Sequence, residues 1–157
     1  MKKALGISFM FVLALAALAG CSPGGFKGVD SAGNRYEVQR DTVTIKGEDV
    51  NATISTGGNL AWPKDMMGDL PELRGNIMAV VNTPDGASVT YNGISKSDYD
   101  AYVSKVKGQG YETAMEMALD KTTMLFVGQK GDNSASIQLH LDGDSGKGNC
   151  VIIYGKS

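Results

Sequence analysis

The chain has 157 residues, a length that predicts one domain, and 42% of them are hydrophobic. Its 15 Lys and Arg against 17 Asp and Glu give a formal net charge of −2, and the basic residues are scattered. This balance argues against nucleic acid as a partner, and it leaves no basic cluster for anionic lipid head groups.

The N-terminus has the pattern of a secretory signal. Two lysines precede an apolar run from Ala4 to Leu18, which is shorter than the roughly 20 residues of a membrane span. The run stops at Gly20-Cys21, and the next residues, Ser22-Pro23-Gly24-Gly25, cannot continue a helix. We therefore expect residues 1–20 to be a signal peptide that is removed.

The four residues Leu18-Ala19-Gly20-Cys21 resemble the lipobox of bacterial lipoproteins. The resemblance implies cleavage before Cys21 and a diacylglycerol group on its sulfur. It implies a protein anchored on the extracytoplasmic face of the cell membrane, or on the outer membrane if the source is Gram-negative. Two or three acyl chains hold such a protein firmly. An ordinary secretory signal followed by a cysteine is the alternative.

Residues 21–34 are rich in glycine, and we expect them to form a flexible tether behind the lipidated Cys21. A single globular domain is expected over residues 35–157. The second cysteine, Cys150, stands in an apolar strand pattern and is expected to be buried and inert.

Alternating segments predict strands in the first half of the domain. Residues 35–45 form a hairpin pattern around Arg40-Asp41, and residues 51–56 add a short strand. A second hairpin is predicted over residues 76–93, with Pro84-Asp85-Gly86 as its turn.

Residues 59–73 contain Trp62-Pro63 and Leu70-Pro71, and two prolines this close predict an irregular segment or one helical turn. We expect this segment to lie as a strap over the edge of the core, with Trp62 as its anchor. An aromatic side chain that grips a ligand is the alternative interpretation of Trp62.

One helix is predicted after the second hairpin. Ser95 is its expected N-cap, and Asp98 follows three residues later, where it favours the positive end of the helix. Apolar residues recur at helical spacing, so one side of this helix is predicted to pack on a sheet. These residues are Tyr99, Tyr102, Val103 and Val106.

Beyond the helix the apolar period becomes two, which is typical of strands. Four such patterns separated by turns lie at residues 111–119, 122–129, 134–141 and 149–154. The predicted fold class is therefore α+β. It is an antiparallel β-sheet, made of hairpins and a C-terminal four-stranded meander, with one main helix packed on one face.

The globular part resembles small lipoproteins of Gram-positive, clostridial-type bacteria. The resemblance rests on Val43-Thr44-Ile45-Lys46, Trp62-Pro63-Lys64-Asp65, Leu70-Pro71, the run from Gly93 to Tyr99 and the run from Lys107 to Tyr111. It covers residues 35–154 and implies no site, because that group has no established chemistry to carry over.

Motifs that suggest chemistry fail on their context. Gly143-Asp144-Ser145-Gly146 matches the nucleophile motif of chymotrypsin-like proteases, but His140 lies too near Ser145 on one strand pattern to form a triad. The segment that begins at Asp142 has Lys147 where a calcium loop requires its glycine and Ile153 where it has its glutamate. One histidine and one free cysteine cannot supply a zinc site. We therefore expect no catalytic residue, no metal and no cofactor.

A protein-binding or ligand-binding adaptor module at the cell surface, with an envelope or extracellular protein as partner, is the function we favour. Small exported sheet domains without convergent titratable groups act through surfaces. A structural envelope component is the alternative, and an enzyme with a site hidden from sequence is the third class.

The candidate partner-binding face is the side of the sheet away from the helix, which is built by residues that alternate with the core. The residues expected there are Ser88, Thr90, Glu112, Glu116, Ser136, Gln138 and His140. A sheet side that is merely solvated is the alternative.

Overall fold

The structure is a computed structural model that describes residues 25–156, apart from residues 32, 49–50 and 144. The predicted signal peptide at residues 1–20 and the predicted lipidation site Cys21 lie outside the described residues. Within the described part, no helix is both long enough and apolar enough to span a bilayer.

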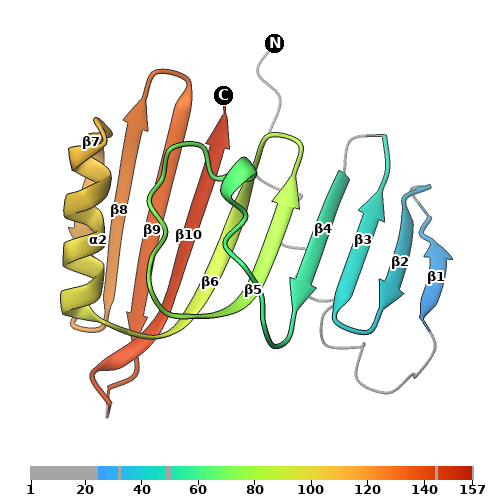
Figure 1. Ribbon diagram of the computed structural model, residues 1–157, viewed down its shortest axis with the longest axis horizontal. Helices are drawn as coiled ribbons and strands as arrows, with labels where there is room; N and C mark the ends of the chain where they lie inside the picture. The colour runs from blue at the N-terminus through green and yellow to red at the C-terminus, as the bar shows by residue number, and fades with distance from the viewer. Residues whose placement is uncertain (1–24, 32, 49–50, 144, 157) are drawn as a thin grey trace.

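The described chain folds into one ten-stranded antiparallel sheet with the order β1-β2-β3-β4-β5-β6-β10-β9-β8-β7 (Figure 1). The strands are β1 (Phe26–Val29), β2 (Arg35–Gln39), β3 (Thr42–Lys46), β4 (Asn51–Thr56), β5 (Asn76–Thr83), β6 (Gly86–Ser95), β7 (Glu112–Ala118), β8 (Thr123–Lys130), β9 (Asn133–Leu141) and β10 (Lys147–Lys156). The expected combination of an antiparallel sheet with one helix is confirmed, and the sheet is by far the larger part.

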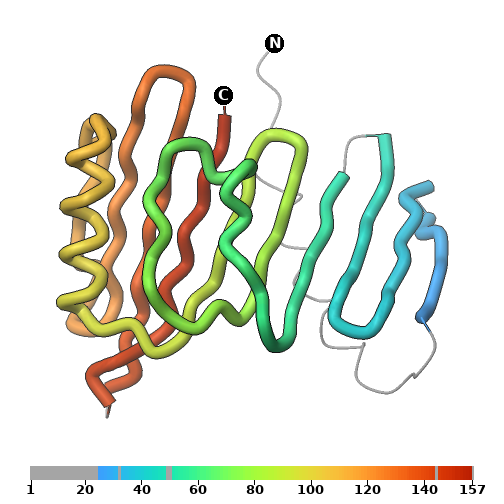
Figure 2. The backbone as a smooth tube through the Cα atoms, in the orientation of Figure 1, coloured from blue at the N-terminus to red at the C-terminus, as the bar shows by residue number. Residues whose placement is uncertain are grey.

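A second layer lies on one side of the sheet, over β6–β10 (Figures 1 and 2). It consists of helix α2 (Lys96–Gly108) and the strap, residues 57–75, which contains the short 3-10 helix η2 (Lys64–Met66). We name this the helix side of the sheet and the opposite side the open side. The main core lies between the sheet and this layer, and its fully buried members include Met67, Tyr91, Tyr102, Val106, Phe126, Ile137, Leu139 and Ile152.

Helix α2 begins at a reciprocal cap. The Ser95 hydroxyl accepts a hydrogen bond from the Asp98 N–H at 3.2 Å, and the Asp98 carboxylate accepts one from the Ser95 N–H at 3.2 Å. This capping box satisfies two backbone donors at the helix start. The Ser95 hydroxyl also donates to the Asp98 carboxylate, and this bond, together with that from the Ser95 N–H, holds the pKa of the Asp98 carboxyl below its ordinary value. The local cap thus sets where the chain leaves β6 and turns onto the helix side.

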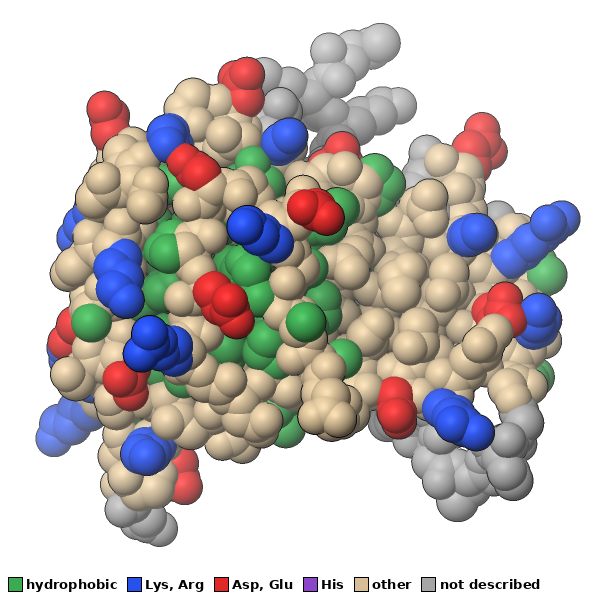
Figure 3. All heavy atoms as spheres, viewed as in Figure 1, with side chains coloured by type: hydrophobic (Ala, Val, Ile, Leu, Met, Phe, Trp, Pro, Cys, Tyr) green, Lys and Arg blue, Asp and Glu red, His purple; other side chains and the backbone are tan. Residues whose placement is uncertain are grey.

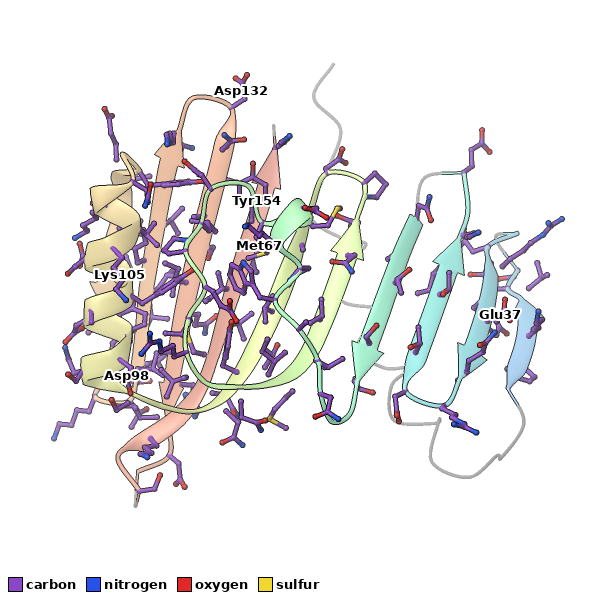
Figure 4. All side chains as sticks on the ribbon, in the orientation of Figure 1. Glu37, Met67, Asp98, Lys105, Asp132 and Tyr154 are labelled. Carbon is purple, nitrogen blue, oxygen red and sulfur yellow. The ribbon has the colours of Figure 1, made fainter. Side chains whose placement is uncertain are left out.

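The strap is held to the sheet by packing and by polar contacts. A Cβ atom on Gly68 would lie 2.5 Å from the Tyr154 ring, so the strap passes directly over that ring, beside the buried Met67 (Figure 4). Asp69 accepts a hydrogen bond from the Tyr111 hydroxyl at 2.8 Å and forms an ion pair with Lys130. The strap therefore spans from β10 to β8.

The tether predicted for residues 21–34 is wrong over Phe26–Val29, which form β1 and pair with β2. Lys27 and Glu37 form an ion pair at 2.8 Å across the two strands. A Cβ atom on Gly28 would lie 2.6 Å from the Tyr36 ring, so this ring covers the glycine. Tertiary contacts with β2 thus order a segment whose glycine content favours a flexible chain.

Candidate binding face

Strand alternation fixes which residues point to the open side of the sheet. On β9, Ala135, Ile137 and Leu139 are fully buried beneath the second layer. Successive side chains of a strand point to opposite sides, so Ser136 and Gln138 point to the open side. Cross-strand partners share a side, and this rule extends the assignment from β9 to every other strand.

One row of cross-strand partners crosses the open side through all ten strands. We call it the first row. It consists of Phe26, Val38, Val43, Ile54, Val81, Ser88, Ile153, Ser136, Val127 and Met115. Its first five members are all apolar, and none of its members is charged.

A second row runs beside the first from β4 to β7. It consists of Thr56, Ala79, Thr90, Val151, Gln138, Leu125 and Met117. This second row is also free of charge. The two rows together give the open side a broad uncharged band of apolar and neutral polar side chains.

Apolar side chains in this band remain in contact with solvent. Phe26 is 58% exposed, Met115 44%, Met117 42% and Ile153 37%. Large exposed apolar groups that gather on one surface mark binding sites, whereas scattered single ones are ordinary. Here the exposed groups belong to continuous rows, so the band is a candidate binding face.

Strands β1–β4 are polar on the helix side. A row of partners there consists of Lys27, Glu37, Thr44 and Thr53, and the surface over β3–β5 shows mostly uncharged polar side chains and backbone (Figure 3). Hydrogen bonds from Lys27 and Gln39 lower the pKa of Glu37, which lies on this side (Figure 4). The apolar side of β1–β4 is therefore the open one, whereas β6–β10 bury their main apolar side under α2 and the strap.

Six of the seven residues proposed for the binding face lie on the open side. Ser88 and Ser136 belong to the first row, and Glu112, opposite Gln129, lies on this side outside both rows. Thr90 and Gln138 belong to the second row, separated by Val151. His140 lies on β9 next to Thr123, whose Oγ1 is 3.0 Å from the His140 Nδ1. The structure thus brings Thr90, Gln138 and His140 onto one surface.

The prediction that Glu116 shares this surface is wrong. Glu116 lies on the helix side, where its carboxylate forms an ion pair of 2.6 Å with Lys107 of α2. The register of β7 against β8 shifts between Thr113 and Met115. Such a bulge inserts one extra residue and reverses the side on which all later side chains lie. The same shift turns Met115 and Met117 to the open side.

Trp62 lies on the strap, hence on the other side of the molecule from Thr90, Gln138 and His140. Its ring centroid is 6.4 Å from that of Tyr91, and its side chain packs against the main core. The geometry is that of an aromatic pair that helps to hold the strap.

Groups with catalytic potential are placed where they cannot act together. Cys150 is fully buried, and burial raises the pKa of its thiol to about 12. The Ser145 hydroxyl donates to the Lys147 carbonyl oxygen and accepts from the Lys147 N–H within its own turn. His140 contacts Thr123 instead of Ser145. Among the residues that the structure describes, no three His, Cys, Asp or Glu side chains gather as metal ligands do.

Sequence reasoning missed the N-terminal half of the face. The alternation of Tyr36, Val38, Val43 and Ile45 is visible in the sequence and predicts one apolar side. It does not tell which side of a common sheet that is. A count of residues between the two hairpins leaves the side undetermined, because each bulge reverses it.

Comparison with known proteins finds no matching family model, no matching curated protein and no matching solved structure.

Proposed function

We propose that this protein is a membrane-anchored extracytoplasmic lipoprotein and works as a binding or adaptor module at the cell surface. The proposal rests on the lipobox ending at Cys21 for the anchor, and on the uncharged band of the open side for binding. The C-terminal four-stranded meander β7–β10, backed by α2, serves as the platform for one half of the band. An envelope or extracellular protein is the partner.

The observation that carries the binding role is the continuity of the first row through ten strands. A side chain that is merely solvated needs no particular neighbour. Here Ile54, Val81 and Ile153 recur in one cross-strand line, and no residue of either row carries a charge. Such a surface suits a flat partner that excludes water.

The binding role is tested by arginine substitutions on the band. Thr90→Arg and Gln138→Arg each place a charge on the second row without touching the main core. Wild-type and variant proteins with Cys21 intact are tagged and recovered from native membranes, and circular dichroism confirms that each variant folds. We expect proteins captured by the wild type to be lost in both variants, because an unpaired charge in a desolvated interface is costly.

Thr53→Arg is the matched control. Thr53 lies on β4, on the helix side, where the neighbouring side chains are polar. We expect this variant to capture what the wild type captures. The same capture by Thr90→Arg and Gln138→Arg would contradict the proposed binding face.

A further inference from the structure

The N-terminal half of the sheet lacks a second layer. In the described part of the chain, α2 and the strap lie over β6–β10, and no element lies over β1–β4 on either side (Figures 1 and 2). A sheet gains stability when its apolar side is buried against another layer. On the apolar side of β1–β4, Ile45 and Ala52 are buried, but Phe26 is 58% exposed and the other first-row side chains are only half-buried, so part of this side still calls for a cover.

We propose that a second copy of this chain supplies the cover, so that two sheets pack with their open sides together in a two-fold dimer. This inference rests on the proposed function, in which the open side is the binding face, and it names the partner. The dimer would be a β-sandwich flanked by the helix layers of the two copies. Sheets packed in this way lie about 10 Å apart.

The first row matches itself under such symmetry. A two-fold axis that runs along the row, midway between the sheets, places each residue of the row opposite the same residue of the other copy. The apolar run from Phe26 to Val81 then faces the identical run, and Ser88 and Ser136 face their own copies. Each apolar group would contact apolar groups and each hydroxyl would face a hydroxyl.

The size of the face is sufficient for a dimer. Ten strands spaced about 4.8 Å apart make a face roughly 48 Å wide. With a usual strand length of about 17 Å, the flat area is roughly 800 Å² for each copy. A standard stable interface buries about 800 Å² for each partner. The band thus offers what a dimer of moderate affinity needs.

The distribution of charge favours a copy over a charged foreign surface. Neither row carries a charge, whereas the helix side carries Lys27, Glu37, Lys107, Glu116 and Lys130. A partner with ionic groups would have to leave them buried and unpaired against this band, which costs several kcal/mol for each group. A second copy presents the same uncharged band and avoids that cost.

The first test measures mass. The full chain with its native anchor is released from detergent micelles and examined by native mass spectrometry. We expect a dimer for the wild type. Ser88→Arg and Ser136→Arg should each raise the dimer dissociation constant by at least ~tenfold, because the axis sets each arginine against the same arginine of the other copy. Thr53→Arg, on the helix side, should leave the dimer unchanged.

The second test measures proximity in cells. Ser136→Cys should be joined to its own copy by a bis-maleimide with a spacer of about 10 Å, the separation of packed sheets. Thr53→Cys serves as the control and should stay uncrosslinked. Cys150 is buried and does not compete for the reagent.

The outcomes separate the two proposals. A monomeric wild type at micromolar concentration, or a dimer that survives both serine substitutions, overturns the dimer. If Thr90→Arg and Gln138→Arg still lose a foreign protein in that case, the proposed function stands with a different partner. Both proposals hold if the wild type is a dimer and the protein that tagged Thr90→Arg and Gln138→Arg no longer capture is an untagged copy of this chain.

Discussion

Cys150 is fully buried in β10, the strand between β6 and β9, and burial raises the pKa of its thiol to about 12. At neutral pH the thiolate, the reactive form, is therefore scarce. The residue acts as a small apolar side chain that fills space in the core.

Cys150 should react with a maleimide only after denaturation. Mass spectrometry of protein treated before and after addition of guanidinium checks this. Cys150→Ala should lower the free energy of unfolding by on the order of 1 kcal/mol, because a small side chain loses its contacts. Rapid labelling of the folded protein would show that the strand around Cys150 opens.

Asp69 is a second residue whose surroundings make a prediction. The hydrogen bond from Lys130, supported by that from Tyr111, lowers the pKa of the Asp69 carboxyl. A carboxyl with a lowered pKa in the folded state stabilises that state above its unfolded pKa of about 3.9, and the gain is lost as pH falls through the folded pKa. The contribution to stability is therefore present at neutral pH and absent in acid.

Asp69→Asn should lower the denaturation midpoint at pH 7, because the ion pair with Lys130 is lost and the strap is held less firmly. In acid, below the folded pKa of Asp69, the variant and the wild type should converge. Urea denaturation at both pH values checks this. Asp132→Asn, in the β8–β9 turn (Figure 4), is the control that should leave the midpoint unchanged at both. A loss that is equal at both pH values would mean that the pair with Lys130 contributes nothing.

Among the elements, β1 depends on one glycine. The Tyr36 ring occupies the space beside Gly28 that any larger residue would fill, and the Phe26 ring lies 5.8 Å from the same tyrosine. The strand has four residues and sits at the edge of the sheet, so it has one neighbour to hold it.

Gly28→Ala should displace the Tyr36 ring and weaken the pairing of β1 with β2. Hydrogen exchange followed by mass spectrometry should show faster exchange in a peptide that covers β2, with little change elsewhere. Gly58→Ala is the matched control, because a Cβ atom there meets no atom within 4 Å. Unchanged exchange in β2 would contradict the role given to Gly28.

Strand β7 shows how one residue changes the character of a whole element. The bulge between Thr113 and Met115 turns Glu116 toward Lys107 of α2 and Met117 toward the open side. Without the bulge, Ala114 would stand in the first row and the charge of Glu116 would interrupt the second row. The uncharged band therefore reaches the last strand of the sheet because of a local irregularity.

For the whole molecule, the anchor is the property that the N-terminal residues predict. Lipidation at Cys21 would hold the domain at the membrane, where its open side would bind a partner. We expect the native protein to begin at residue 21 and to carry added acyl mass when examined by mass spectrometry. Cys21→Ser should release the domain into the soluble fraction, since the thioether to diacylglycerol cannot form. Unchanged retention of this variant in the membrane fraction would contradict the anchor.

The sequence by itself determined most of the elements and their bounds. The capping residues Ser95 and Asp98, the turn at Pro84-Asp85-Gly86 and the strand at residues 51–56 follow from interactions between neighbours in the chain. Such interactions act over a few residues, so a local pattern is sufficient to predict them.

Only the tertiary structure decided which residues share a surface. The side on which a strand residue lies depends on its partner in the next strand, and one bulge reverses it, as at Glu116. Likewise, residues 26–29 form a strand only because they contact Tyr36 and Glu37, which lie on β2. The uncharged band arises because the registers of the nine strand pairings agree across the sheet, and agreement between distant segments is not visible in any one of them.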